Sequence, residues 1–105
     1  MAIYFEKKKI SMKKIICLNS NIVIDYFYIE ENVWKRVVDT RIVDTVIYSV
    51  GVKSVLQCLI HCHSLVNCTS INYDISRKYC DLNYGTIESV FNIESNTDFE
   101  FWQRM

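Results

Sequence analysis

Apolar residues between positions 55 and 62 recur at intervals of three and four, the spacing that places them on one face of an α-helix. Ser54 stands just before this run and Gln57 follows three residues later, a capping box that predicts where the helix begins. Because the face carries two cysteines, we expect both sulfur atoms to point into the core. Its members are Val55, Cys58, Leu59 and Cys62.

Beyond the helix the pattern changes to an alternation of apolar and polar residues, which is typical of half-buried β-strands. The alternation runs through residues 70–74 and again through residues 79–83. The segment between them, Ile75-Ser76-Arg77-Lys78, is short and polar. The two runs therefore predict antiparallel strands joined by a hairpin, with the helix covering one face of the sheet.

Four of the five cysteines form the pattern Cys58-x3-Cys62-x5-Cys68-x11-Cys80. Two cysteines one helical turn apart can each be tied to a different neighbouring segment, so the spacing favours disulfides that staple the helix to the sheet. The alternative is an intracellular zinc-stabilised domain, because sulfur and nitrogen ligands gather in the same stretch. Those ligands would come from Cys58, His61, Cys62, His63 and Cys68.

Catalysis by a Cys/His pair is not expected from this arrangement. His61 and His63 flank Cys62 in sequence but leave the helix in other directions, so we interpret both as exposed helix residues. The sequence also lacks a glycine-rich phosphate loop and a Ser/His/Asp arrangement. We therefore expect neither an enzyme nor a bound cofactor.

The cysteine segment resembles the PAN/apple module. The resemblance covers roughly residues 33–105, which we take as the expected domain, with a strand-like lead-in through residues 37–50 and a closing strand at residues 99–102. The matching motifs are Val52-x-Ser54-x3-Cys58-x3-Cys62, then Cys68-x-Ser70-x-Asn72-Tyr73, then Cys80-x-Leu82-Asn83.

The resemblance implies an α+β fold in which an antiparallel sheet cradles one disulfide-stapled helix. It implies that Cys62 is bonded to Cys68 and Cys58 to Cys80. It also implies a secreted or extracellular module for binding or adhesion to a protein or a carbohydrate. Cys17 has no partner in this pairing, so we expect a free thiol, an intermolecular link or part of a removed segment.

Length and charge agree with one small binding domain. The chain has 105 residues, with 12 basic and 12 acidic side chains, so no global field favours nucleic acid and we expect no nucleic-acid partner. A module of about seventy residues buries little apolar surface, and a disulfide that closes a loop of about fifteen residues contributes roughly 3 kcal/mol. Two such bonds would matter for folding.

Residues 1–32 lie outside the resemblance and form an N-terminal extension. Lysines at positions 7–9 and 13–14 precede a short apolar run at residues 15–18, as in a secretory signal, but the run is interrupted by residues 19–21 and by Asp25. A degenerate signal segment and an ordered extension both remain open. Neither short apolar run approaches the length needed to span a bilayer, so we expect no transmembrane segment.

The candidate ligand-binding residues lie in loops, where a rigid scaffold usually presents its recognition groups. They are the hairpin cations Arg77 and Lys78, together with Tyr84 and Phe91 from the irregular stretch at residues 84–96. Aromatic rings near cations suit a sugar face or a protein hot spot. If these residues do not bind, the next surface to examine is the strand edge at residues 41–48.

Asn67-Cys68-Thr69 is a formal N-glycosylation sequon in the turn between the helix and the first hairpin strand. Asn67 is therefore a candidate glycosylation site. The alternative is that Asn67 ends the helix in the left-handed conformation.

Overall fold

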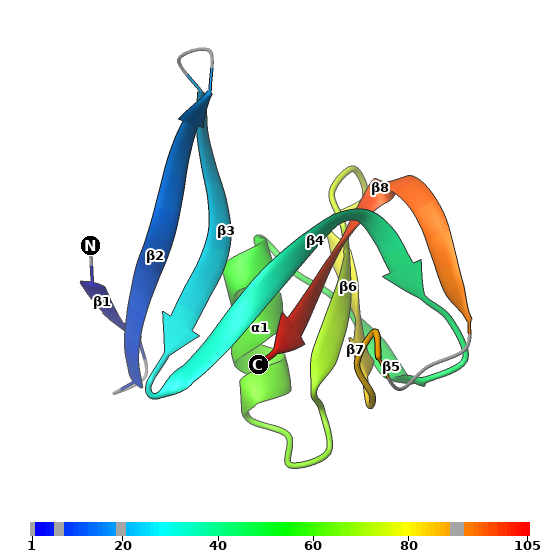
Figure 1. Cartoon of the computed structure of the whole chain (residues 1–105). Coiled ribbons are helices and arrows are strands. Elements are labelled where there is room, and N and C mark those ends of the chain that lie inside the picture. Colours follow the sequence, from blue (N-terminus) through cyan, green and yellow to red (C-terminus); the bar gives the residue numbers. More distant parts are fainter. Residues whose placement is uncertain (1, 6–7, 19–20, 89–91) are drawn as a thin grey trace.

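A computed structural model describes residues 2–5, 8–18, 21–88 and 92–105. Its eight strands form one antiparallel sheet in the order β1-β2-β3-β4-β8-β6-β7-β5, with one helix packed on β6 and β7 (Figure 1). The predicted α+β fold is confirmed. The elements are β1 (Ala2–Phe5), β2 (Lys8–Leu18), β3 (Asn21–Ile29), β4 (Asn32–Ile42), β5 (Val46–Gly51), α1 (Val55–His63), β6 (Ser70–Asp74), β7 (Tyr79–Asn83) and β8 (Ile93–Arg104).

The predicted hairpin is confirmed as β6 and β7. Tyr73 lies opposite Cys80, and Ile71 lies opposite Leu82, so the apolar side chains of the two strands share one face. On its other side β6 pairs with β8, where Ile71 lies opposite Trp102. The hairpin is therefore an interior part of the sheet, and every residue of β6 is buried.

Two predicted boundaries are wrong. The lead-in at residues 37–50 is not one strand, because Asp44 adopts a left-handed φ of 76° between β4 and β5. The irregular stretch was expected to reach residue 96, but β8 begins at Ile93, which pairs with Ile42. Residues 93–98 are mostly exposed or half-buried, so that part of the strand carries no apolar alternation to reveal it.

A register shift between Val38 and Thr40 bends β4 and its partner β8. Asp39, at the shift, has a left-handed φ of 55°. Beyond it the two strands curve together (Figure 1), and the backbone of Ile42 comes within hydrogen-bond distance of the Asn72 side chain on β6. The β6–β7 part of the sheet is thus covered by α1 on one face and by the far ends of β4 and β8 on the other.

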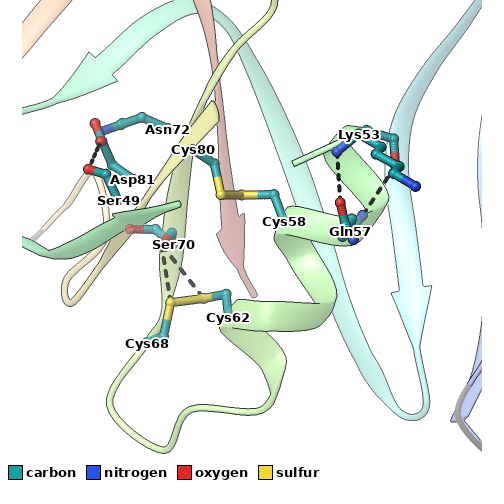
Figure 2. Close-up of a disulfide and its surroundings, with 11 residues drawn as sticks. Ser49, Lys53, Gln57, Cys58, Cys62, Cys68, Ser70, Asn72, Cys80 and Asp81 are labelled. Carbon is teal, nitrogen blue, oxygen red and sulfur yellow. Dashed lines mark hydrogen bonds between the residues drawn. A yellow bond between two sulfur atoms is a disulfide. The ribbon is translucent and has the colours of Figure 1, made fainter. Parts of the chain in front are cut away.

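The helix begins as predicted. The Ser54 hydroxyl accepts a hydrogen bond from the Gln57 amide at 3.3 Å, while the Gln57 side chain accepts from the Lys53 amide at 2.7 Å (Figure 2). The reciprocal bond of the capping box therefore reaches the residue before the cap. The helix ends at His63, and its cap is Ser64 in a right-handed conformation. The alternative role of Asn67 as a left-handed helix end is wrong, since Asn67 does not have a positive φ.

Two disulfides join α1 to the chain that follows it (Figure 2). Cys58 is bonded to Cys80 on β7, with 6.2 Å between the Cα atoms, and Cys62 is bonded to Cys68, with 5.2 Å between the Cα atoms. This is the pairing that the resemblance implies. All four cysteines are fully buried, and they belong to the main apolar core together with Leu59, Ile71, Leu82 and Trp102.

The end of the N-terminal extension contributes to the same core. Phe27 and Ile29 of β3 are buried, and the ring of Phe27 lies 5.3 Å from that of Trp102. The β2–β3 hairpin places the Cys17 backbone opposite Ile22. No helix in the described part of the chain is long and apolar enough to cross a lipid bilayer. The domain boundary at residue 33 stays a prediction.

The two disulfides are expected to differ in their contribution to stability. Cys58 and Cys80 are 22 residues apart, whereas Cys62 and Cys68 are six apart. In the chain-entropy model the longer loop contributes about 3 kcal/mol and the shorter about 2 kcal/mol. Removing both cysteines of the longer pair should therefore lower the free energy of unfolding more, as measured by urea denaturation of Cys58→Ala/Cys80→Ala against Cys62→Ala/Cys68→Ala.

Cys17→Ser is the control for this experiment and should be the mildest change. Peptide mapping without reduction should recover Cys58 linked to Cys80, and a peptide linking Cys58 to Cys62 would contradict the pairing. The denatured, non-reduced chain should also weigh four hydrogens less than the reduced chain. A zinc site would instead give the full thiol mass once the metal is lost.

Candidate binding surface

The tip of the β6–β7 hairpin is held rigid by the carboxylate of Asp74. This carboxylate accepts hydrogen bonds from the Ser76 amide at 3.1 Å, the Ser76 hydroxyl at 3.0 Å and the Arg77 amide at 2.9 Å. Lys78 closes the turn with a left-handed φ of 54°, and its amide donates to the Asp74 carbonyl. The turn thus has a fixed backbone, while the side chains of Arg77 and Lys78 are exposed.

The environment of Asp74 favours its ionised form. Burial raises the pKa of this carboxyl, but the hydrogen bonds from Arg77 and Ser76 and the charge of Arg77 outweigh burial and lower the pKa below its ordinary value. Asp74 is only 1 % exposed, so its charge is stabilised by the turn rather than by water. The hairpin tip therefore depends on a carboxylate that stays charged to low pH.

A third cation and a hollow lie at the same end of the sheet. The Val52 amide donates to the Lys78 carbonyl at 3.0 Å, which brings the start of α1 beside the hairpin tip. The next residue, Lys53, is exposed and lines a hollow of about 200 Å³. Leu56 and Ile60 give this hollow an apolar part. The remaining lining residues are Ser54 and Gln57. Lys53, Arg77 and Lys78 form what we call the basic end.

Few acidic groups of the described residues lie near the basic end, and the carboxylate of Asp74 already accepts hydrogen bonds within the turn. Asp74 is buried beneath the turn, and Arg77 approaches it through Nε at 3.9 Å while remaining 75 % exposed. Asp98 is exposed and meets the tip through its carbonyl, which accepts from the Ile75 amide at 3.0 Å. Most of the positive charge of Arg77, Lys78 and Lys53 therefore faces solvent.

The structure does not bring the predicted binding residues into one patch. Tyr84 is 53 % exposed, but it lies at the opposite end of β7, where its amide donates to the Thr45 carbonyl. The five residues of β7 lie between Lys78 and Tyr84. The six steps of extended chain span roughly 20 Å. Phe91 lies outside the described residues. Arg77 and Lys78 thus share a surface with Lys53, not with Tyr84.

In the part of the chain that the structure describes, the histidines and cysteines are not placed to form a metal site. Cys58, Cys62 and Cys68 are in disulfides, and the described residues contain no group of three potential ligands placed to hold a metal ion. His61 is exposed as expected. His63 is not, because its side chain is only 10 % exposed and its Nε2 lies 3.7 Å from Glu30. The turn before β4, which contains Glu30, covers the side chain of His63.

Sequence reasoning missed a buried polar cluster on the face opposite α1. The side-chain amide of Asn72 donates to the Ile42 carbonyl at 2.7 Å and to Asp81 at 3.0 Å, and its oxygen accepts from the Ile42 amide at 2.8 Å. Asp81 also accepts from the Ser49 hydroxyl (Figure 2) and lies 3.7 Å from Arg41. The only sequence signal was a polar residue at every second position of β6, which a solvent-facing strand shows equally.

A family model described as PAN domain matches residues 33–104. The comparisons with curated proteins and with solved structures gave no match. The matched segment runs from the second residue of β4 to the last residue of β8. It contains both disulfides, the basic end and the buried polar cluster.

Stability should depend on pH through Asp74. Because the folded pKa is depressed, its contribution is fully present above the unfolded pKa of about 3.9 and is lost as the pH falls through the folded value. Asp74→Asn should therefore flatten the fall in unfolding free energy between about pH 5 and the acid limit. Chemical denaturation as a function of pH measures this, and an unchanged slope in the variant would contradict the assignment.

At neutral pH, Asp74→Ala should cost more than Asp74→Asn. Alanine leaves the amides of Ser76 and Arg77 without an acceptor, at about 1–3 kcal/mol for a buried group, whereas the asparagine oxygen can still accept. Ser76→Ala is the matched control because it removes only the hydroxyl donor.

We propose that Asn67 is a glycosylation acceptor. Its side chain is exposed, whereas the central residue of the sequon, Cys68, is fully buried in a disulfide. Expression in a secretory host followed by glycosidase treatment should give a mass shift that Asn67→Gln abolishes. Cys62→Ser/Cys68→Ser should raise the occupancy, because the acceptor segment is then no longer closed by the bond. Equal masses before and after treatment in both the native chain and this variant would contradict the proposal.

Proposed function

Because the chain belongs to the PAN domain family, we propose that it is an extracellular module that binds a protein or a carbohydrate and has no catalytic activity. Modules of this family generally act as extracellular protein- or carbohydrate-binding domains. Two buried disulfides support an oxidising compartment, since such bonds are rare where thiols are kept reduced.

The observation that carries a more specific proposal is the basic end. Three exposed cations, Lys53, Arg77 and Lys78, project from a turn and a helix start whose backbones are fixed by internal hydrogen bonds. A rigid backbone reduces the entropy lost when a partner binds. We therefore assign the ligand a negative charge, as in a sulfated or carboxylated carbohydrate or an acidic protein surface.

Arginine and lysine would contribute differently to this contact. The planar guanidinium of Arg77 can form two parallel hydrogen bonds with a sulfate or carboxylate, whereas Lys53 and Lys78 act as point charges. The hollow beside Lys53 has Leu56 and Ile60 in its lining, so it suits a ring or an aliphatic group next to the anion. A ligand with both features fits this surface best.

Tyr84 and Phe91 remain proposed contacts for a larger ligand only. The span of roughly 20 Å from Lys78 to Tyr84 exceeds the reach of a monosaccharide, but an extended polysaccharide or a protein can cover it. Dependence on Tyr84 therefore distinguishes a long ligand from a short one. The basic end is required in both cases.

Replacing two cations should weaken binding without unfolding the domain. We expect Arg77→Ala/Lys78→Ala to reduce affinity about tenfold or more, which corresponds to about 1.4 kcal/mol, because a charge-assisted contact is lost. The ligand is first identified on a glycan array and by pull-down from extracellular matrix, and affinity is then measured by titration. The thermal midpoint should stay nearly unchanged, since both side chains are exposed.

Tyr84→Ala is the control at the opposite end of β7. Native-like affinity of Tyr84→Ala with loss in the cation variant places a short ligand at the basic end. Full affinity of Arg77→Ala/Lys78→Ala, with or without added salt, would refute this site and move the search to residues 41–48.

A further inference from the structure

The last strand of the sheet, β5, presents an open edge. Among the described residues β5 pairs only with β7, so its other side has no strand beside it. Val46 and Tyr48 are 38 % and 46 % exposed. The strand has the sequence VIYSVG, which contains neither a charge nor a proline. Natural sheet edges are usually protected by such residues, by a bulge or by a covering segment. The pairing of β5 with β7 is irregular between Val46 and Tyr48 but regular from Tyr48 to Gly51.

The hydrogen-bond ladder shows which backbone groups face this edge. The Val52 amide donates inward to the Lys78 carbonyl, and inward and outward residues alternate along an antiparallel strand. Ser49 and Gly51 therefore direct their amides and carbonyls away from β7. A Cβ atom at Gly51 would meet no other atom within 4 Å, so the face of the sheet at that residue is uncovered. The edge offers donors and acceptors for another strand.

Charges at the two ends of β5 select the strand that fits. Asp44 precedes β5 and Lys53 follows it, and both are exposed. In an antiparallel pair of identical strands, the acidic start of one lies beside the basic end of the other. A twofold axis perpendicular to the sheet at Ser49 would place Lys53 of each copy opposite residue 45 of the other, next to Asp44.

We propose that the open edge of β5 binds β5 of a second copy of this chain, antiparallel and centred on Ser49, so that the two sheets become continuous. The outward amide and carbonyl of Ser49 meet those of the other Ser49, and the uncharged strands pair without burying a charge. The partner is a second copy because the charge pattern of this segment is complementary to itself in that direction. Of the basic end, Lys53 takes part in this contact, whereas Arg77 and Lys78 do not.

Reversing the charge at Asp44 or Lys53 tests whether the partner is a second copy and whether the two β5 strands pair in the proposed register. Asp44→Lys and Lys53→Glu each turn two symmetric attractions into repulsions, so each should weaken self-association about tenfold. Mixing the two variants should restore association as a heterodimer, because every opposed pair is then of opposite sign. The measurement is sedimentation velocity of the full chain at increasing concentrations up to about 1 mM, at low salt.

A second variant tests the edge itself. Tyr48→Lys places a charge on an exposed edge position and should abolish the dimer, while its thermal midpoint stays close to that of the native chain. Val66→Lys, at a fully exposed apolar residue outside β5, is the control and should leave the dimer intact. A chain that stays monomeric throughout the concentration range overturns the proposal. So does a dimer that Tyr48→Lys leaves intact, or one that the mixed charge variants fail to restore.

Discussion

The burial of β6 on both faces is the constraint on which the rest of the structure depends. Its apolar side lies under α1, and its polar side lies under the far ends of β4 and β8 and the chain after β7. A buried polar group without a partner costs free energy comparable to several ordinary contacts, so each polar side chain of β6 must be satisfied. Ser70 donates to the Gly85 carbonyl, Asn72 bonds the backbone of Ile42, and Asp74 holds the hairpin turn.

These three residues therefore fix three different segments from one strand. The disulfides act on the opposite face, where Cys58 joins α1 to β7 and Cys62 joins the end of α1 to the chain entering β6. Covalent bonds on one face and hydrogen bonds on the other leave the central hairpin little freedom. The exposed cations of the basic end stand on this hairpin, which explains how a small core can present a fixed surface.

The sequence predicted the structure correctly where a local pattern is compatible with one structure only. Ser54 with Gln57 marked the helix start, and the alternation around residues 75–78 marked the hairpin. It was uninformative where the same pattern has two meanings, as for Asn72 and Asp81, whose alternation fits a covered polar face and a solvent face alike. The early start of β8 was hidden because its first residues pair along the backbone without burying apolar side chains. The separation of Lys78 from Tyr84 was available in the sequence, since a whole strand lies between them.

The register shift at Asp39 also makes the domain sensitive to the number of residues in β4. Between the paired positions β4 has one residue, Asp39, whereas β8 has four, residues 96–99. Side chains on a strand change face at every step, so the number of residues at the shift decides which side chains of β4 beyond it turn toward β6. With Asp39 present, Ile42 is fully buried, and the Arg41 guanidinium lies over the ring of Phe99 and 3.7 Å from Asp81. Without that residue the two positions would exchange faces, which would remove Ile42 from the core and take Arg41 away from Asp81. A single-residue insertion or deletion in β4 at this point is thus a change of inside for outside.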